Sequence, residues 1–121
     1  MDKLNNTYHL YNHLANLFAN TSEDNENWPK EEICQIIDEL DNEILNIEFP
    51  IAIFNKNGMK IKNIFEGGKN EIKLAEKYHN YANSILNTYP ITAKSLIDAS
   101  ERFYESAKFE DYMSVNNNWR F

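Results

Sequence analysis

The sequence predicts a single all-α domain, residues 1–121, with two N-terminal helices packed on an antiparallel helical hairpin near the C-terminus. Apolar residues recur at spacings of three and four through most of the chain, which is the period of a helix with one buried face. The 121 residues include only three Gly and three Pro, and 42% of them are apolar, which suffices for one core.

Two amphipathic helices are predicted in the first half of the chain. The first runs from about residue 6 to residue 20, and a polar segment at 22–27 follows it. The second begins at Trp28-Pro29, because Pro fits the first helical position. It ends at Phe49-Pro50, because a residue before Pro avoids the α region. The apolar face of this second helix consists of Ile33, Ile36, Ile37, Leu40, Ile44 and Ile47.

Residues 50–68 are predicted to form an irregular or short β connector. Asn57-Gly58 lies between two apolar runs, a pattern typical of a β-hairpin. A short helix from Pro50 to Asn57, with Gly58 as its left-handed cap, fits the same residues. We favour the short helix, because a lone hairpin would have no further strand to pair with. Residues 59–65 are expected to be extended in either case.

The helical hairpin is predicted to begin near Asn70, which suits an N-cap. Its second helix starts at Pro90, and the short turn there requires the two helices to be antiparallel. Small residues on both helices allow close packing, and we expect residues 116–121 to leave the helix. These small residues are Ala75, Ala82, Ala93, Ala99, Ser100 and Ala107.

The net charge of −7 is concentrated in the first half of the chain. Residues 23–48 carry ten carboxylates and a single cation, Lys30. Such a field repels nucleic acid and anionic lipid and attracts a basic partner. The alternative is a solvated helix face whose charges serve only to keep the protein soluble. If the face is functional, a protein partner docks on the exposed side of the second helix through Glu31, Asp38, Glu39, Asp41, Asn42 and Glu43.

Two tyrosines, Tyr81 and Tyr112, are further candidates for the interface, because they lie at the edge of their apolar stripes. Tyrosine is favoured at interfaces for its large apolar body and polar tip. We expect a cytoplasmic protein, since the N-terminus lacks a signal-peptide pattern and no run of about 18 apolar residues is present. The sequence specifies no oligomeric state.

No catalytic or cofactor motif is recognisable, so we expect neither an enzyme nor a bound cofactor or metal. His9 and His13 are four residues apart and, with His79, are the basis of one alternative, a small metal-dependent helical enzyme. No cysteine cluster or Glu-x-x-His pair supports that site. Cys34, the only cysteine, fits a small buried side chain better than a nucleophile. Gly67-Gly68-Lys69-Asn70 lacks the P-loop pattern.

The chain is short, acidic and rich in Asn, Lys and Ile, and its second half is similar to a helical pattern of small bacterial proteins. That pattern runs from Phe65-Glu-Gly-Gly68 through Tyr89-Pro-Ile-Thr-Ala93 to Tyr104-Glu-Ser-Ala-Lys-Phe-Glu-Asp111. In these features the chain resembles the immunity proteins of contact-dependent growth inhibition and related polymorphic toxin systems. The resemblance implies tight binding and neutralisation of a cognate toxin, many of which are basic nucleases. The alternative is a phage- or plasmid-encoded acidic inhibitor that mimics nucleic acid.

Overall fold

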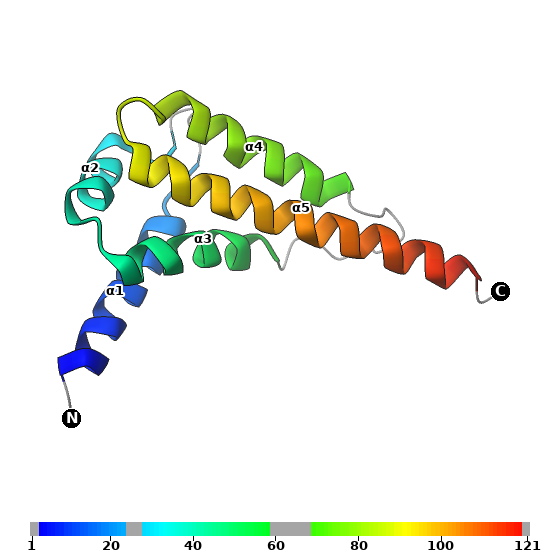
Figure 1. The fold of residues 1–121 in the computed structure, drawn as a ribbon, viewed down its shortest axis with the longest axis horizontal. Coiled ribbons are helices and arrows are strands. Elements are labelled where there is room, and N and C mark those ends of the chain that lie inside the picture. Colours follow the sequence, from blue (N-terminus) through cyan, green and yellow to red (C-terminus); the bar gives the residue numbers. More distant parts are fainter. Residues whose placement is uncertain (1–2, 24–27, 59–68, 120–121) are drawn as a thin grey trace.

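The computed structural model describes residues 3–23, 28–58 and 69–119, and of residues 3–5 and 110–119 the backbone alone. These residues form five helices and no strand, which confirms the predicted all-α class (Figure 1). The helices are α1 (Lys3–Ala19), α2 (Glu31–Leu40), α3 (Glu43–Gly58), α4 (Lys69–Ile85) and α5 (Pro90–Trp119). In this part of the chain, no helix is both long and apolar enough to cross a lipid bilayer.

The hairpin of α4 and α5 is the framework of the fold. The two helices run antiparallel and side by side, as predicted (Figure 1). All six small residues singled out for close packing are buried. The turn closes where the N–H of Tyr89 donates to the carbonyl of Ile85 at 2.7 Å, and Pro90 then begins α5. On the other side of α5, α3 packs against it and also against α1, while α2 contacts α5.

The predicted second helix is two helices, which corrects the sequence interpretation. α2 ends at Asp41, which adopts a left-handed conformation with φ of 40° and donates its N–H to the carbonyl of Ile37. Aspartate tolerates this conformation better than most residues. Asn42 then caps α3, because its Oδ1 accepts the N–H of Leu45 at 2.9 Å. α2 also begins at Glu31, two residues later than Pro29.

Pro50 does not end a helix but lies inside α3, which is a second correction. A proline in a helix interior cannot donate to the carbonyl four residues back and costs about 3 kcal/mol. The neighbouring Phe49 and Ile53 are fully buried, and burying two such side chains offsets that cost. Residues 50–57 are therefore helical but continuous with the preceding turns, so they form neither a hairpin nor an irregular connector. Residues 59–65 lie outside the described residues.

The C-terminal end of the chain also differs from the expectation. α5 continues to Trp119, so residues 116–119 do not leave the helix. Asparagine is only a few tenths of a kcal/mol poorer than average as a helix former, so three in a row do not stop a helix. Arg120 and Phe121 lie outside the described residues.

Aromatic rings from four parts of the chain meet in the centre of the core. Trp28, which follows α1, lies 6.2 Å from the ring of Phe49 on α3 and 5.7 Å from that of Tyr78 on α4. Tyr78 stacks in turn on Phe103 of α5, at 5.7 Å between centroids. Trp28 is only 2% exposed. The segment between α1 and α2 thus supplies the side chain around which the N-terminal helices and the hairpin assemble.

Candidate functional site

Asp38, one of the predicted docking residues, caps a neighbouring helix. Its Oδ2 accepts the N–H of Ile91 at 3.0 Å, and its Oδ1 accepts the N–H and the hydroxyl of Thr92 at 2.9 and 2.6 Å. These N–H groups belong to the first turn of α5, whose N–H groups have no acceptor within the helix. The carboxylate also meets the positive end of the helix dipole. Asp38 is therefore half-buried and holds α2 to α5, instead of lying on the exposed face of its own helix as predicted.

Replacing Asp38 by Ala is expected to lower the free energy of unfolding by about 2 kcal/mol, because α5 loses its cap and a charge at its N-terminus. Asp38→Asn keeps one acceptor and is expected to lose about half as much. The neighbouring Glu39 is exposed, and Glu39→Ala should stay within about 0.5 kcal/mol of the wild type. Urea titration of all three variants measures the difference. Equal stability of Asp38→Ala and Glu39→Ala would contradict the capping role.

The other predicted docking residues are divided between structural and exposed positions. Asp41 and Asn42 form the junction described above, and Asp41 Oδ1 also accepts the amide of Asn46 at 2.9 Å. Glu31 is exposed and accepts the hydroxyl of Tyr89 at 3.0 Å. Glu39 and Glu43 are exposed, as predicted. The break at Asp41 therefore separates the residues that were expected to share one rigid helix face.

Of the two tyrosine candidates, the structure describes the side chain of Tyr81 alone. Tyr81 is half-buried, with its ring 5.8 Å from Trp28 and 5.7 Å from Tyr78, so it belongs to the aromatic core. Burial raises the pKa of its hydroxyl. For Tyr112 the structure describes only the backbone.

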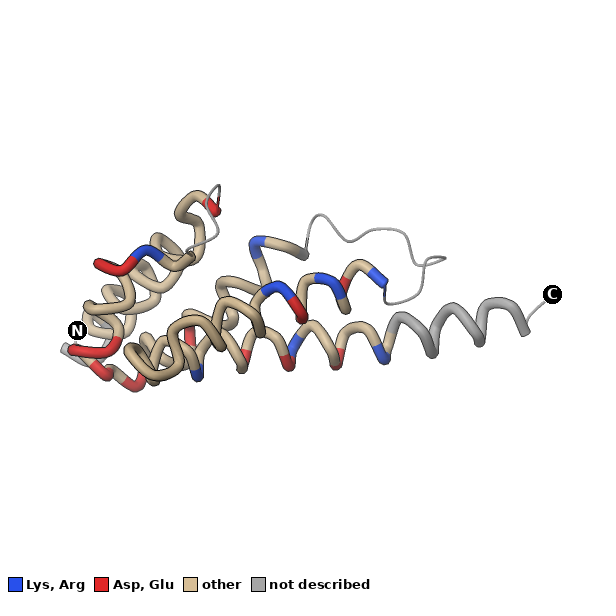
Figure 2. The backbone as a smooth tube through the Cα atoms, turned by 90° about the horizontal axis from the view of Figure 1, so that it is seen from above, with Lys and Arg blue, Asp and Glu red and all other residues tan. Residues whose placement is uncertain are grey.

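A groove with a volume of about 1040 Å³ lies between α3 and α5. We call the apolar residues of its lining the floor and the charged residues its rims, which hold five carboxylates against two cations, Lys94 and Arg102. The apolar residues are Ile47, Pro50 and Phe54. The carboxylates are Asp41, Glu43, Asp98, Glu101 and Glu105. Figure 2 shows acidic positions along α5 and again where α2 meets α3.

Two ion pairs on α5 only weakly reduce the negative charge of this groove. Lys94 lies 3.6 Å from Asp98, and Lys108 lies 3.6 Å from Glu105. Both lysines are more than three-quarters exposed, and such surface pairs contribute about 0–1 kcal/mol. Each pair is loose enough for the carboxylate to exchange its lysine for a cation from a partner.

The α5 side of the groove was missed because residues 61–121 carry equal numbers of acidic and basic side chains. A sum over the segment hides how its charges are arranged. The usable signal was spacing, since Asp98, Glu101 and Glu105 are three and four residues apart and therefore share one helix face. Only Asp41 and Glu43 had been included among the predicted docking residues.

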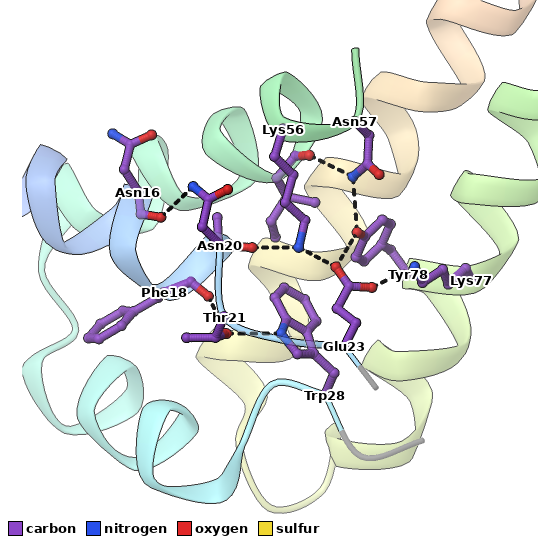
Figure 3. A network of polar contacts seen from close by, with 12 residues as sticks. Asn16, Phe18, Asn20, Thr21, Glu23, Trp28, Lys56, Asn57, Lys77 and Tyr78 are labelled. Atoms are coloured by element: carbon purple, nitrogen blue, oxygen red, sulfur yellow. Dashed lines mark hydrogen bonds and ion pairs between the residues drawn. The ribbon is translucent and has the colours of Figure 1, made fainter. Parts of the chain in front are cut away.

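A second polar site surrounds Glu23, which follows α1. Its carboxylate forms ion pairs with Lys56 of α3 and Lys77 of α4 (Figure 3). Its Oε2 also accepts the hydroxyl of Tyr78 at 2.8 Å, and that hydroxyl accepts the amide of Asn57 at 3.0 Å. The Glu23 and Lys56 side chains are each 14% exposed. We call Glu23, Lys56, Lys77, Tyr78 and Asn57 the Glu23 cluster.

The Glu23 cluster joins the segment after α1 and the last turn of α3 to the middle of α4, next to the aromatic core. The ammonium of Lys56 lies 4.5 Å from the centre of the Trp28 ring and also donates to the carbonyl of Ala19. Burial would raise the pKa of the Glu23 carboxyl, but hydrogen bonds from Lys56, Lys77 and Tyr78 outweigh that effect and hold the pKa below its usual range. Burial, followed by the nearby Glu23 charge, raises the pKa of Tyr78. The Glu23 carboxylate is therefore paired with two lysines and a tyrosine hydroxyl, which is typical of a structural network.

Neither Cys34 nor the histidines form a reactive arrangement. Cys34 is buried as predicted, with Sγ 3.5 Å from the carbonyl of Pro29. Burial and the charge of Asp38 raise the pKa of its thiol to about 11, which disfavours the nucleophilic thiolate. His9 and His13 are exposed on α1 and His79 on α4. Among the described residues, no three His, Cys, Asp or Glu side chains gather in a way that would hold a metal ion.

The α3–α5 groove and the Glu23 cluster are two polar features that the fold builds from several helices. The cluster is largely closed to solvent and internally paired, whereas the groove is exposed and carries an excess of negative charge over an apolar floor. The groove is the better candidate for a binding site. Comparison of the sequence with known protein families, with curated proteins and with solved structures found no match.

Proposed function

We propose that this chain is a binding protein of the immunity type, which neutralises a basic protein toxin by forming a stoichiometric complex through the α3–α5 groove. The observation that carries the proposal is the groove itself, with five carboxylates and two cations around an apolar floor. An apolar centre with a charged rim is the usual anatomy of a specific protein interface.

Electrostatics favours a cationic partner at this groove. Glu43 and Glu101 are exposed at its rims, on α3 and α5 respectively, so they contribute to the field around the protein. Complementary charge accelerates association, which matters for an inhibitor that must act before its target does damage. The α2 face supports docking less well, because Asp38 is committed to the cap of α5 and Glu31 accepts a bond from Tyr89.

The apolar floor increases the affinity for the partner, whereas the charges mainly increase the association rate. Ile47, one of the three apolar residues that line the groove, is 51% exposed. Removing such a side chain from water contributes about 1 kcal/mol, and that gain is independent of salt. A complex that covers the groove and its surroundings should bury on the order of 1,600 Å².

The proposal is tested with two variants of equal net charge. Glu43→Lys with Glu101→Lys reverses the groove, and Glu39→Lys with Glu76→Lys reverses two exposed residues elsewhere on α2 and α4. Both pairs raise the net charge of −7 by four. The partner is the polypeptide encoded beside the gene for this chain, co-expressed with each variant. We expect the groove pair to slow association at least about tenfold and to abolish growth protection, and the other pair to protect like the wild type.

Three outcomes would overturn the proposal in different ways. If both pairs lose protection equally, net charge rather than the groove determines binding. If only Glu39→Lys with Glu76→Lys loses protection, the dock is elsewhere on the surface. If the wild-type chain neither binds nor protects against the neighbouring polypeptide, the immunity function is wrong.

A further inference from the structure

The apolar floor of the α3–α5 groove repeats with the period of a helix. Ile47, Pro50 and Phe54 are three and four residues apart on α3, so they form one stripe with axial steps of about 4.5 and 6 Å. Phe54 is anchored by its contact with Phe103, with ring centroids 5.0 Å apart, so the stripe has a fixed position. Ile47 stands further into solvent, at 51% exposure.

The groove lining on α5 spans a longer stretch of helix than the apolar floor on α3. On α5 the lining runs from Lys94 to Ser106, which corresponds to about 18 Å along the helix axis. At the other wall, Asp41 and Glu43 lie at the start of α3. The groove is therefore long enough for about three turns of a helix. Such a helix would contact the floor with an apolar face and the carboxylates with its two flanks.

We infer that the element of the partner that enters this groove is a cationic amphipathic α-helix, an inference that rests on the proposed function. Its apolar residues recur at i, i+3 or i+4, and i+7, and lie on the stripe of Ile47, Pro50 and Phe54. Lysine or arginine residues on both flanks of that helix meet Glu43 on one side and Glu101 on the other. This is the helix-in-groove mode of recognition.

Two features of the groove disfavour an extended strand as its occupant. Both walls are helices, whose backbone groups bond within the helix, so the groove offers no sheet edge to which a strand could add. A strand presents side chains to one face about every 6.6–6.8 Å, which matches neither step of the floor. A partner helix whose apolar residues are three and four positions apart has the same steps along its axis as the floor.

The test uses two synthetic 14-residue peptides of identical Lys, Leu and Ala composition. In one the leucines follow the helical three-four period, and in the other they alternate with polar positions as in a strand. Fluorescence anisotropy at about 0.15 M salt measures affinity for the full chain, and circular dichroism measures helix gained on binding. We expect the helical-period peptide to bind at least about tenfold more tightly and to become helical, because only it can match both floor and rims.

Two matched substitutions locate the binding. Ile47→Ser removes an exposed side chain from the floor, and Leu10→Ser removes a side chain of similar exposure, 54%, from α1. We expect Ile47→Ser to weaken binding of the helical-period peptide about fivefold to tenfold, and Leu10→Ser to leave it unchanged. Equal binding of the two peptides, binding without gain of helix, or equal effects of the two substitutions would each overturn the inference. Growth protection by the wild type and by Glu43→Lys with Glu101→Lys judges the proposed function separately, because that result does not depend on whether the partner's element is a helix.

Discussion

Replacing Trp28 by Ala is expected to lower the free energy of unfolding by about 4 kcal/mol, the largest effect of any single change proposed for this chain. Trp28 is among the largest fully buried side chains, and its ring contacts Phe49, Tyr78 and Tyr81. Its removal leaves a cavity where residues from α3 and α4 meet, and neighbouring side chains cannot close it without moving the helices. For a domain of this size such a loss is a large share of total stability.

The comparison variant Trp28→Phe separates ring packing from hydrogen bonding. Phenylalanine keeps much of the aromatic volume but removes the indole N–H that donates to Thr21 Oγ1 at 3.0 Å. We expect Trp28→Phe to cost about 2 kcal/mol, from lost volume and the lost hydrogen bond to Thr21, whose hydroxyl still donates to the carbonyl of Phe18. Denaturant titration followed by far-ultraviolet circular dichroism measures both variants. Trp28→Ala with a loss below about 1 kcal/mol would show that the aromatic cluster does not hold the helices together.

The hairpin of α4 and α5 could be predicted because every local signal agreed with it. Apolar and small residues recur on one face of each helix, and Pro90 both closes the turn and begins the second helix. The small residues Ala82 and Ala99 are fully buried, as close packing requires. Local propensity and tertiary packing point to the same structure, which is where sequence interpretation is strongest.

The break between α2 and α3 could not be predicted from periodicity, because the apolar stripe continues across it. Leu40 and Ile44 are four residues apart, as they would be in an unbroken helix. The signal was chemical, since Asp41 tolerates a left-handed cap and Asn42 suits the start of a helix. Both had been interpreted as part of a polar face. Pro50 was wrongly predicted to end a helix. The local preference of proline against a helix interior is outweighed here by the burial of Phe49 and Ile53.

The candidate groove was only half predictable, because it depends on which helices become neighbours. The carboxylates Asp41 and Glu43 were identified from the charge of the first half of the chain. Asp98, Glu101 and Glu105 join them only because α3 packs on α5. The role of Asp38 was hidden for the same reason, since the helix that it caps begins more than 50 residues later.

Replacing Glu23 by Gln is expected to cost about 3 kcal/mol, because it leaves Lys56 and Lys77 close together without the carboxylate that both contact. Lys77 is 40% exposed and can turn towards water, which places the cost at the lower end of the range for buried pairs. Glu76→Gln, an exposed substitution one residue before Lys77, is the matched control and should stay within about 0.5 kcal/mol of the wild type.

The pH dependence of the same variant tests the charge on Glu23. The pKa of its carboxyl is lower in the folded state than the ordinary value of 4.5. Protonation therefore favours unfolding, so the contribution of the carboxylate is complete well above pH 4.5 and declines as the pH falls below it. We expect the stability difference between wild type and Glu23→Gln to be constant from about pH 6 to pH 8 and to shrink towards pH 3. A difference that grew in acid would mean that the carboxyl is protonated in the folded protein.

A double-mutant cycle with Lys56→Met separates the ion pair from the packing around it. Methionine retains the stem of Lys56 over the Trp28 ring but carries no charge. If the ion pair couples the two residues, Glu23→Gln combined with Lys56→Met is less destabilising than the sum of the single changes, by about 1–2 kcal/mol. Strict additivity in urea titrations would instead mean that each side chain acts through separate contacts. The cluster would then not join the end of α1 to α3 and α4 as a unit, because such a unit requires one carboxylate to hold both lysines together.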